Sequence, residues 1–314
     1  MISRRVLRIK VMQILYAFFI KGENSLDKSE KELLHSIEKT YDLYHNLLYL
    51  ITIISDYALM KIDQAKSKIF PTHDDLNPNM KFVNNKVISQ IANNTFLNKY
   101  LQSKKLNWYN YYEFIKKLYN EIKSSDYYIN YMNNPKYSYD EDKKLVIDIY
   151  TYNIANNEDL YNVLEEESIY WNDEVEFIIS MIIKTIKKFK EENNDKNELL
   201  PLYKNEDDEN FVKTLFRKSI LKKDIAVEIV KKFLKNWELE RVAFLDNILM
   251  EMAIIEALEF KDIPIKVTIN EYIEIAKYYS TNKSNVFING ILDKVFIYLK
   301  ENNQLIKEGK GLIE

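Results

Sequence analysis

The chain has 314 residues, of which 46% are hydrophobic, so it is long enough for one large or two ordinary domains with a sizeable core. Its 45 lysines and arginines stand against 48 acidic residues, and the net charge of −3 excludes a chain that binds polyanions over its whole surface. The absence of cysteine excludes disulfides, zinc thiolate sites and cysteine nucleophiles, and it fits a cytoplasmic protein. The chain has only four glycines and five prolines, and this scarcity of turn residues favours an all-α fold.

The first expected helix, from about Ser3 to Ile20, begins with a basic cluster. Arg4, Arg5 and Arg8 lie one and four residues apart, so they project close together near the helix start, where cations oppose the helix dipole. A phosphate backbone would explain this placement, because the arginine fork matches phosphate oxygens, and an ordinary solvated basic end is the alternative. Polar residues interrupt the apolar run that follows, so we expect neither a signal peptide nor a membrane span.

The middle of the chain shows helical periodicity with few breaks. Expected helices run over residues 26 to beyond 54, 84–101, 108–123, 145–156, 159–168 and 173–190. The segment 108–123 carries Tyr109, Tyr111, Tyr112 and Tyr119 among lysines. Such a pattern can stack on single-stranded bases, but at helical spacing it is also typical of core packing.

A charged linker at 191–209 separates this region from the helical segments that end the chain. These segments begin near residue 211 and run through 220–237 and 239–260. Pro264 marks a break, and Thr268 with Glu271 has the pattern of a capping box, which predicts a helix start at Thr268. Ser284 can cap a second helix. Gly290 inside that helix predicts the close approach of another backbone, and a merely tolerated glycine is the alternative.

The segment that follows Pro264 resembles the C-terminal signature of the NusB family of bacterial transcription antitermination proteins. The matching stretches are Asp262-Ile-Pro-Ile-Lys-Val-Thr-Ile-Asn-Glu-Tyr-Ile-Glu-Ile-Ala-Lys277 and Phe287-Ile-Asn-Gly-Ile-Leu-Asp-Lys294. The arginines followed by Gln13-Ile-Leu-Tyr16 are similar to the family's first helix. The stretch Leu249-Met-Glu-Met-Ala253-x-x-Glu256 is similar to its fifth, although Glu251 stands where arginine is usual. The resemblance covers about residues 1–55 and 208–298 and leaves the long middle of the chain as an insertion.

The resemblance implies two small NusB-like helical bundles with an inserted helical region. We therefore expect NusB-like N-terminal helices at 1–58, a helical insertion at 59–207, NusB-like core helices at 208–300 and a C-terminal tail at 301–314. It also implies an RNA-binding transcription antitermination factor that acts on ribosomal RNA operons and catalyses no reaction. The implied partners are a single-stranded boxA-like RNA, the small-subunit ribosomal protein NusE and the RNA polymerase antitermination complex.

The resemblance also indicates which residues would contact these partners. The expected RNA-binding residues are Arg4, Arg5, Arg8, Lys283, Ser284, Asn285, Phe287 and Asn289. Phe287 can equally belong to the core, and Val286 stands where the family often has a basic residue, a loss for which Lys283 can compensate. Asp246 matches a position that is usually acidic in the family, and we expect it to meet the basic surface of the protein partner.

The sequence contains no catalytic constellation. It has no glycine-rich phosphate loop, no paired-histidine metal motif and no serine nucleophile motif, so we expect no catalytic residue, metal or cofactor. Two other functions remain open. One is a helical protein–protein adaptor that does not bind RNA. The other is the NusB-like domain of a ribosomal RNA cytosine methyltransferase, although such enzymes use catalytic cysteines and this chain has none.

Overall fold

The computed structural model describes residues 2–22, 25–102, 104, 106–234 and 242–312. Within these ranges the chain forms α-helices with a few 3-10 turns and one π-helical turn, and no β-strand occurs. The expected all-α fold is therefore confirmed. No helix in the described ranges is both long enough and apolar enough to cross a lipid bilayer.

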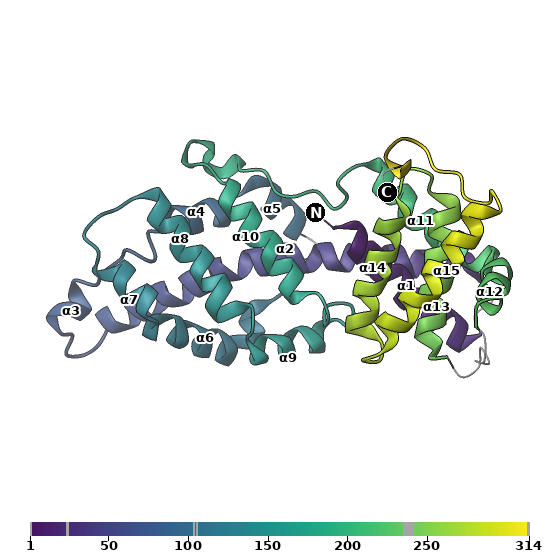
Figure 1. The fold of residues 1–314 in the computed structure, drawn as a ribbon. Helices are drawn as coiled ribbons and strands as arrows, with labels where there is room; N and C mark the ends of the chain where they lie inside the picture. Colours follow the sequence, from purple (N-terminus) through teal and green to yellow (C-terminus); the bar gives the residue numbers. More distant parts are fainter. Residues whose placement is uncertain (1, 23–24, 103, 105, 235–241, 313–314) are drawn as a thin grey trace. The chain divides into compact units, whose positions relative to one another are not determined.

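The chain divides into two compact units (Figure 1). Unit 1 comprises residues 1–37 and 202–314, and unit 2 comprises residues 38–201. The boundary at residue 37 falls inside one long helix, α2 (Leu26–Lys66). The expected limits of the NusB-like parts and of the insertion, at 58 and 207, stay a prediction.

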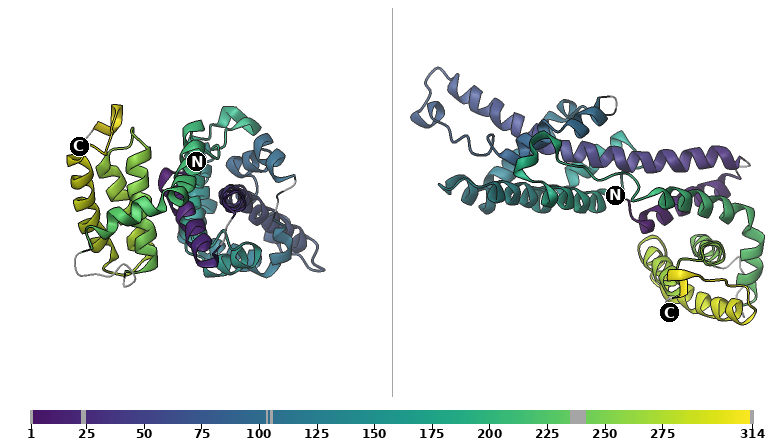
Figure 2. Two further views of the ribbon diagram at one scale, coloured as in Figure 1. Left: turned by 90° about the vertical axis from the view of Figure 1, so that its right-hand side faces the viewer. Right: turned by 90° about the horizontal axis from the view of Figure 1, so that it is seen from above.

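Unit 1 is built around one enclosed helix, α13. Its helices are α1 (Arg4–Lys21), the first part of α2, α11 (Glu206–Leu221), α12 (Lys223–Lys231), α13 (Phe244–Glu259), α14 (Ile265–Tyr279) and α15 (Ser284–Glu301), followed by the 3-10 turn η5 (Gly309–Leu312). α1, α11, α12, α14 and α15 all pack against α13 (Figure 2). Every residue from Ile248 to Ala257 is buried, as expected for a helix that is apolar on nearly all sides.

Unit 2 contains the rest of α2 and the shorter helices of the middle of the chain. These are α3 (His73–Leu76), α4 (Lys86–Ala92), α5 (Thr95–Leu101), η1 (Trp108–Tyr111), α6 (Tyr112–Ser124), α7 (Asp126–Asn133), α8 (Tyr139–Ile149), the π-helix η2 (Tyr150–Ile154), α9 (Glu158–Glu167), α10 (Val175–Lys188) and η3 (Glu191–Lys196). The buried hydroxyl of Tyr44 on α2 hydrogen-bonds Thr185 on α10, and Tyr150 donates to the carbonyl of Leu47. Side chains of α2 therefore join elements that are distant in sequence.

Most expected helices are present, but several of their limits differ. The segment 84–101 forms two helices instead of one, because the side chain of Asn94 accepts from the backbone N–H of Leu97 and starts α5. α11 begins at Glu206, earlier than expected, after a similar cap from Asn205. The expected end at 237 and the expected start at 239 lie outside the described residues.

The predicted capping box at Thr268 is wrong. α14 begins at Ile265, directly after Pro264, so that Thr268 lies one turn inside the helix. The Thr268 hydroxyl donates to Glu256 on α13, and Glu271 binds Arg5 on α1. Both side chains therefore join helices instead of capping one.

The predicted close contact at Gly290 is also wrong for this chain. A Cβ atom added at Gly290 would meet no heavy atom within 4 Å apart from the backbone of its own stretch of helix and its chain neighbours. The glycine therefore lies beside open space on α15, and packing within the chain does not require it. A tight approach occurs instead at Gly311, where an added Cβ would lie 1.9 Å from the carbonyl oxygen of Lys261.

Candidate nucleic-acid interface

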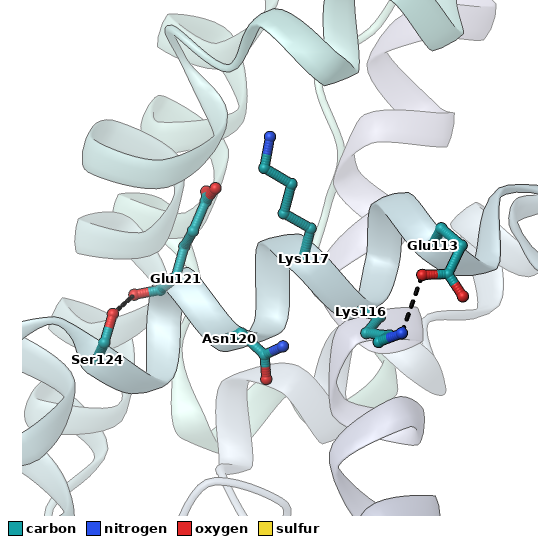
Figure 3. Close-up of a pocket in the computed structure, with 6 residues that line it drawn as sticks. All are labelled: Glu113, Lys116, Lys117, Asn120, Glu121 and Ser124. Carbon is teal, nitrogen blue, oxygen red and sulfur yellow. Dashed lines mark hydrogen bonds and ion pairs between the residues drawn. The ribbon is translucent and has the colours of Figure 1, made fainter.

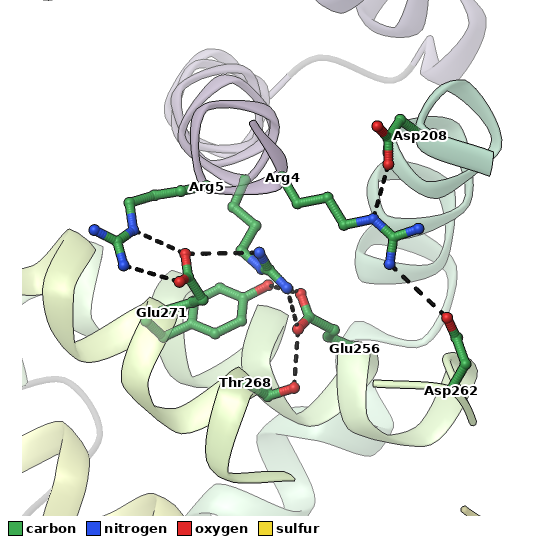
Figure 4. A network of polar contacts seen from close by, with 9 residues as sticks. Arg4, Arg5, Asp208, Glu256, Asp262, Thr268 and Glu271 are labelled. Carbon is green, nitrogen blue, oxygen red and sulfur yellow. Dashed lines mark hydrogen bonds and ion pairs between the residues drawn. The ribbon is translucent and has the colours of Figure 1, made fainter. Parts of the chain in front are cut away.

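The predicted arginine cluster lies at the start of α1, where each guanidinium meets a carboxylate (Figure 4). Ser3 caps the helix by accepting from the N–H of Val6. Arg4 Nε donates to Asp208 on α11 at 2.9 Å, and its Nη1 lies 3.9 Å from Asp262. Arg5 makes two bonds of 2.8 Å to Glu271 on α14, which raise the pKa of Arg5. The side chains of Arg4 and Arg5 remain 32% and 45% exposed.

Arg8 is buried, with a side chain that is only 2% exposed. Its Nε and Nη2 each lie 2.7 Å from an oxygen of Glu256, which is fully enclosed on α13. Thr268 and Tyr272 donate to the same carboxylate at 2.9 and 3.1 Å. Burial alone would lower the pKa of Arg8, but the charge and hydrogen bonds of Glu256 raise it above its ordinary value. Arg8 is therefore a permanent cation that fastens α1 to α13.

Carboxylates surround the arginine cluster within the fold, and its contact with RNA stays a prediction. Arg4, Arg5 and Arg8 contact four carboxylates, those of Asp208, Asp262, Glu256 and Glu271. Lys307 and Glu274 add one charge of each sign at longer range. The start of α1 therefore carries no excess of positive charge, and the enclosed guanidinium of Arg8 does not face solvent.

The second group of predicted residues lies at the corner between α14 and α15. There Asp246 on α13 accepts hydrogen bonds from Ser280 at 2.5 Å and from Ser284 at 2.7 Å. Ser284 Oγ also accepts from the N–H of Thr281 at 3.2 Å. Both Asp246 and Ser284 are buried. In this conformation Asp246 holds the corner in place and does not present its carboxylate to a basic partner, and Ser284 does not present its hydroxyl to RNA.

The remaining predicted residues of the corner reach the surface. Lys283 is exposed, and Asn285, Phe287 and Asn289 are half-buried. Asn285 and Asn289 are four residues apart and so share one face of α15. The structure thus gathers these residues on one helical end, while the arginines belong to another helix.

Sequence reasoning missed the carboxylates that neutralise the arginines. Asp208, Glu256 and Glu271 come from three different helices, and Glu256 is 248 residues from Arg8. A local pattern carries no sign of such pairs. The only available signal was that Glu256 and Glu271 occur within the family motifs themselves.

Two surface hollows of the described residues, one along α6 and one along α2, are open to solvent. The hollow along α6 is lined by Glu113, Lys116, Lys117, Asn120, Glu121 and Ser124 (Figure 3). Both of its lysines are already paired, since Lys116 contacts Glu113 and Lys117 contacts Asp159. In the described ranges no group of three or more histidine, aspartate or glutamate side chains gathers as metal ligands do.

The tyrosines of the same region divide between core and surface. Tyr119 is buried, whereas Tyr109 is 68% exposed and Tyr112 is also exposed. Tyr111 donates to Glu167, which ties η1 to α9. Neither the core prediction nor the stacking prediction therefore describes all four rings.

Comparison with known proteins identifies relatives for part of the chain. The model of the NusB family matches residues 175–296. A transcription antitermination protein NusB from Salinibacter ruber is 40% identical over 114 residues, which are 36% of this chain and 71% of that protein. The NusB protein of Dictyoglomus turgidum is 42% identical over 99 residues, or 32% of this chain and 68% of that protein.

A third relative matches more closely over a shorter stretch. The transcription antitermination protein NusB from Chloroherpeton thalassium is 51% identical over 85 residues, which are 27% of this chain and 40% of that protein. No solved structure matches. The likeness to these relatives thus covers about a third of the chain or less in each case.

Proposed function

We propose that this chain, which belongs to the NusB family of transcription antitermination proteins, acts as an antitermination factor on ribosomal RNA operons. In this role it binds a single-stranded boxA-like RNA together with the ribosomal protein NusE and joins an RNA polymerase antitermination complex. It works by binding, without catalysis, metal or cofactor. The observation that carries the proposal is the identity to NusB proteins over more than two thirds of the length of two of them.

The surface that best supports RNA binding is the corner between α14 and α15. From Ile275 to Leu292 the chain carries two lysines, Lys277 and Lys283, and no acidic residue. Asn285 and Asn289 add amides that can donate to and accept from base edges. Phosphate contacts made by Lys283 would position the strand, and amide contacts would distinguish bases.

Arg4 and Arg5 contribute to RNA binding in a different way from Arg8. Their part-exposed guanidinium groups can exchange a carboxylate for a phosphate, but each exchange breaks an ion pair, with Asp208 for Arg4 and with Glu271 for Arg5. The net gain from such an exchange is therefore small. Arg8 acts through the fold, because it fixes the helix that carries the other two arginines.

RNA binding is tested with the full chain, NusE and a labelled boxA-like RNA oligonucleotide, by fluorescence anisotropy over a range of salt concentrations. We expect binding that weakens steeply with salt and is stronger when NusE is present. Lys283→Gln should lower the affinity and reduce the salt slope by about one. Lys123→Gln, at an exposed lysine of unit 2, is the matched control and should leave both unchanged. A chain that binds no RNA with or without NusE would refute the proposal.

The neutralised arginine cluster favours a second function, that of a protein–protein adaptor. If carboxylates hold Arg4 and Arg5 permanently, the chain keeps its fold and its protein contacts without any RNA contact at α1. The same titration separates the two functions. An adaptor binds NusE in a pull-down and fails to shift the anisotropy of the RNA.

A further inference from the structure

We propose that the ring of Tyr278 is a stacking platform for an RNA base beside the corner of α14 and α15. This inference rests on the proposed RNA-binding function. It assigns base stacking to a residue that lies outside the sequence motifs and outside the residues predicted to contact RNA.

Tyr278 has the exposure that a stacking platform needs. It lies in the last turn of α14 and is 81% exposed. In the part of the chain that the structure describes, no aromatic ring or cation packs on its face. An isolated tyrosine ring in water is one that the fold does not use for its own core.

The backbone on both sides of Tyr278 is firmly held. Ser280, two residues later, donates to the buried carboxylate of Asp246, and its N–H donates to the carbonyl of Ala276 at 3.0 Å. Ser284 binds the same Asp246, so the end of α14 and the start of α15 are joined through one carboxylate. A ring mounted on such a corner loses little backbone entropy when a base stacks on it.

The charge around Tyr278 favours a nucleic acid over an acidic partner. Lys283 is exposed five residues further on, and Lys277 precedes the tyrosine. Lys277 pairs with Glu274, so of these two lysines Lys283 is the one whose ammonium group can contact a phosphate. Val286, which is 72% exposed in the first turn of α15, adds apolar surface to the same corner.

Together these features have the composition of a single-strand binding surface. Such surfaces combine a positive charge that follows the backbone with aromatic rings on which bases stack. Stacking tolerates any base, whereas the amides of Asn285 and Asn289 can distinguish one base from another. We therefore assign to Tyr278 a contribution to RNA affinity, and to Asn285 and Asn289 the selection of one base over another.

The test measures RNA binding by the full chain with NusE present, using a labelled boxA-like oligonucleotide. Tyr278→Ala should weaken binding about 5- to 150-fold, the range that corresponds to one lost base stack. Tyr278→Phe keeps the ring and should bind within about twofold of the wild type. Tyr109→Ala removes a tyrosine of similar exposure from unit 2 and serves as the matched control.

A second readout reports the stack itself. When 2-aminopurine replaces one base at a time, its fluorescence should be quenched at one position by the wild type and by Tyr278→Phe, and not by Tyr278→Ala. If the wild type binds RNA and Tyr278→Ala binds it with the same affinity, this inference is overturned and the proposed function stays intact. A wild type that binds no RNA would refute the proposed function itself. Loss of NusE binding by Tyr278→Ala, with RNA binding kept, would assign the ring to a protein contact and overturn the inference.

Discussion

At the residue scale, the most consequential contact is the enclosed pair of Arg8 and Glu256. Two hydrogen bonds of 2.7 Å join them, and Thr268 and Tyr272 occupy further lone pairs of the carboxylate. A buried charge is tolerable only when its partners are complete. The arrangement therefore fixes the position of α1 against α13 and α14.

We predict that removing one member of this pair destabilises unit 1 strongly. Arg8→Gln or Glu256→Gln should each cost about 3–5 kcal/mol of unfolding free energy, because the remaining charge stays buried without its partner. Urea unfolding followed by circular dichroism measures the loss. Arg8→Lys should also destabilise, since an ammonium cannot form the same two parallel bonds.

The control for this prediction replaces both charges at once. Arg8→Met with Glu256→Leu should recover much of the stability lost by either single substitution, because no unpaired charge remains. Losses below about 1 kcal/mol in the single variants would show that the pair does not determine the packing of α1. For the same reason Arg8→Glu cannot serve as a test of RNA binding, because it would place two carboxylates together in the core.

At the scale of a helix, Gly290 lies within the continuous helix α15 without a packing reason inside the chain. The Cβ of an alanine there would meet no heavy atom within 4 Å apart from the backbone of its own stretch of helix and its chain neighbours. We predict that Gly290→Ala raises the unfolding free energy by about 0.5–1 kcal/mol, through a better helix propensity and a less flexible unfolded chain. Thermal unfolding measures the gain, and Gly311→Ala should destabilise, because its Cβ would collide with Lys261.

The same substitution also tests the surface of α15. A stabilised Gly290→Ala variant that binds RNA and NusE as the wild type does would show that the glycine is merely tolerated. A stabilised variant that binds either partner poorly would show that a partner, and not this chain, approaches the helix at that point.

At the scale of the whole molecule, the two compact units suggest where the chain can be cut. Removal of residues 62–205 would keep residues 38–61 of α2, whose apolar side chains pack on other helices of unit 2. We predict that this deletion aggregates. Replacement of residues 38–201 by a short Gly/Ser linker should leave a folded helical unit 1, because its own helices supply its core. Size-exclusion chromatography and circular dichroism distinguish the two outcomes, and equal behaviour of the two deletions would contradict the prediction.

The two units should also respond to pH in opposite directions. Burial raises the pKa of Glu251 in unit 1 to about 7 from its ordinary 4.5, despite the opposing charge of Lys223. Its folded form holds the proton longer, so unit 1 loses stability as pH rises from about 4.5 to 7. Burial lowers the pKa of His45 in unit 2 to about 4 from 6.5, so unit 2 loses stability as pH falls from about 6.5 to 4.

Hydrogen exchange of the amides of α13 and of residues 38–66 of α2, corrected for intrinsic rates, follows each unit separately. Glu251→Gln should stabilise α13 above pH 7 by on the order of 1–3 kcal/mol and change little near pH 4.5. His45→Phe should remove the loss of protection in α2 at low pH. Parallel pH profiles for both units in the wild type would contradict this prediction.

The sequence by itself determined the fold class, most helices and the family resemblance. Helix formation is local, because a stripe of apolar side chains with the 3.6-residue period marks each buried face. Low glycine and proline content excluded frequent turns, and the long helix from Leu26 followed from its stripe alone. The signature from Asp262 to Lys294 is likewise contiguous, so it could be recognised without any knowledge of packing.

Only the tertiary structure decided which side chains are available to a partner. Arg8 and Arg5 look equivalent in the sequence, yet one meets Glu256 in the core and the other remains part-exposed on Glu271. Ser284 and Lys283 are neighbours, but only the serine is buried, because it hydrogen-bonds Asp246, which is 38 residues away. Ion pairs and burial depend on which helix faces meet, and that choice is made by the packing of all helices together.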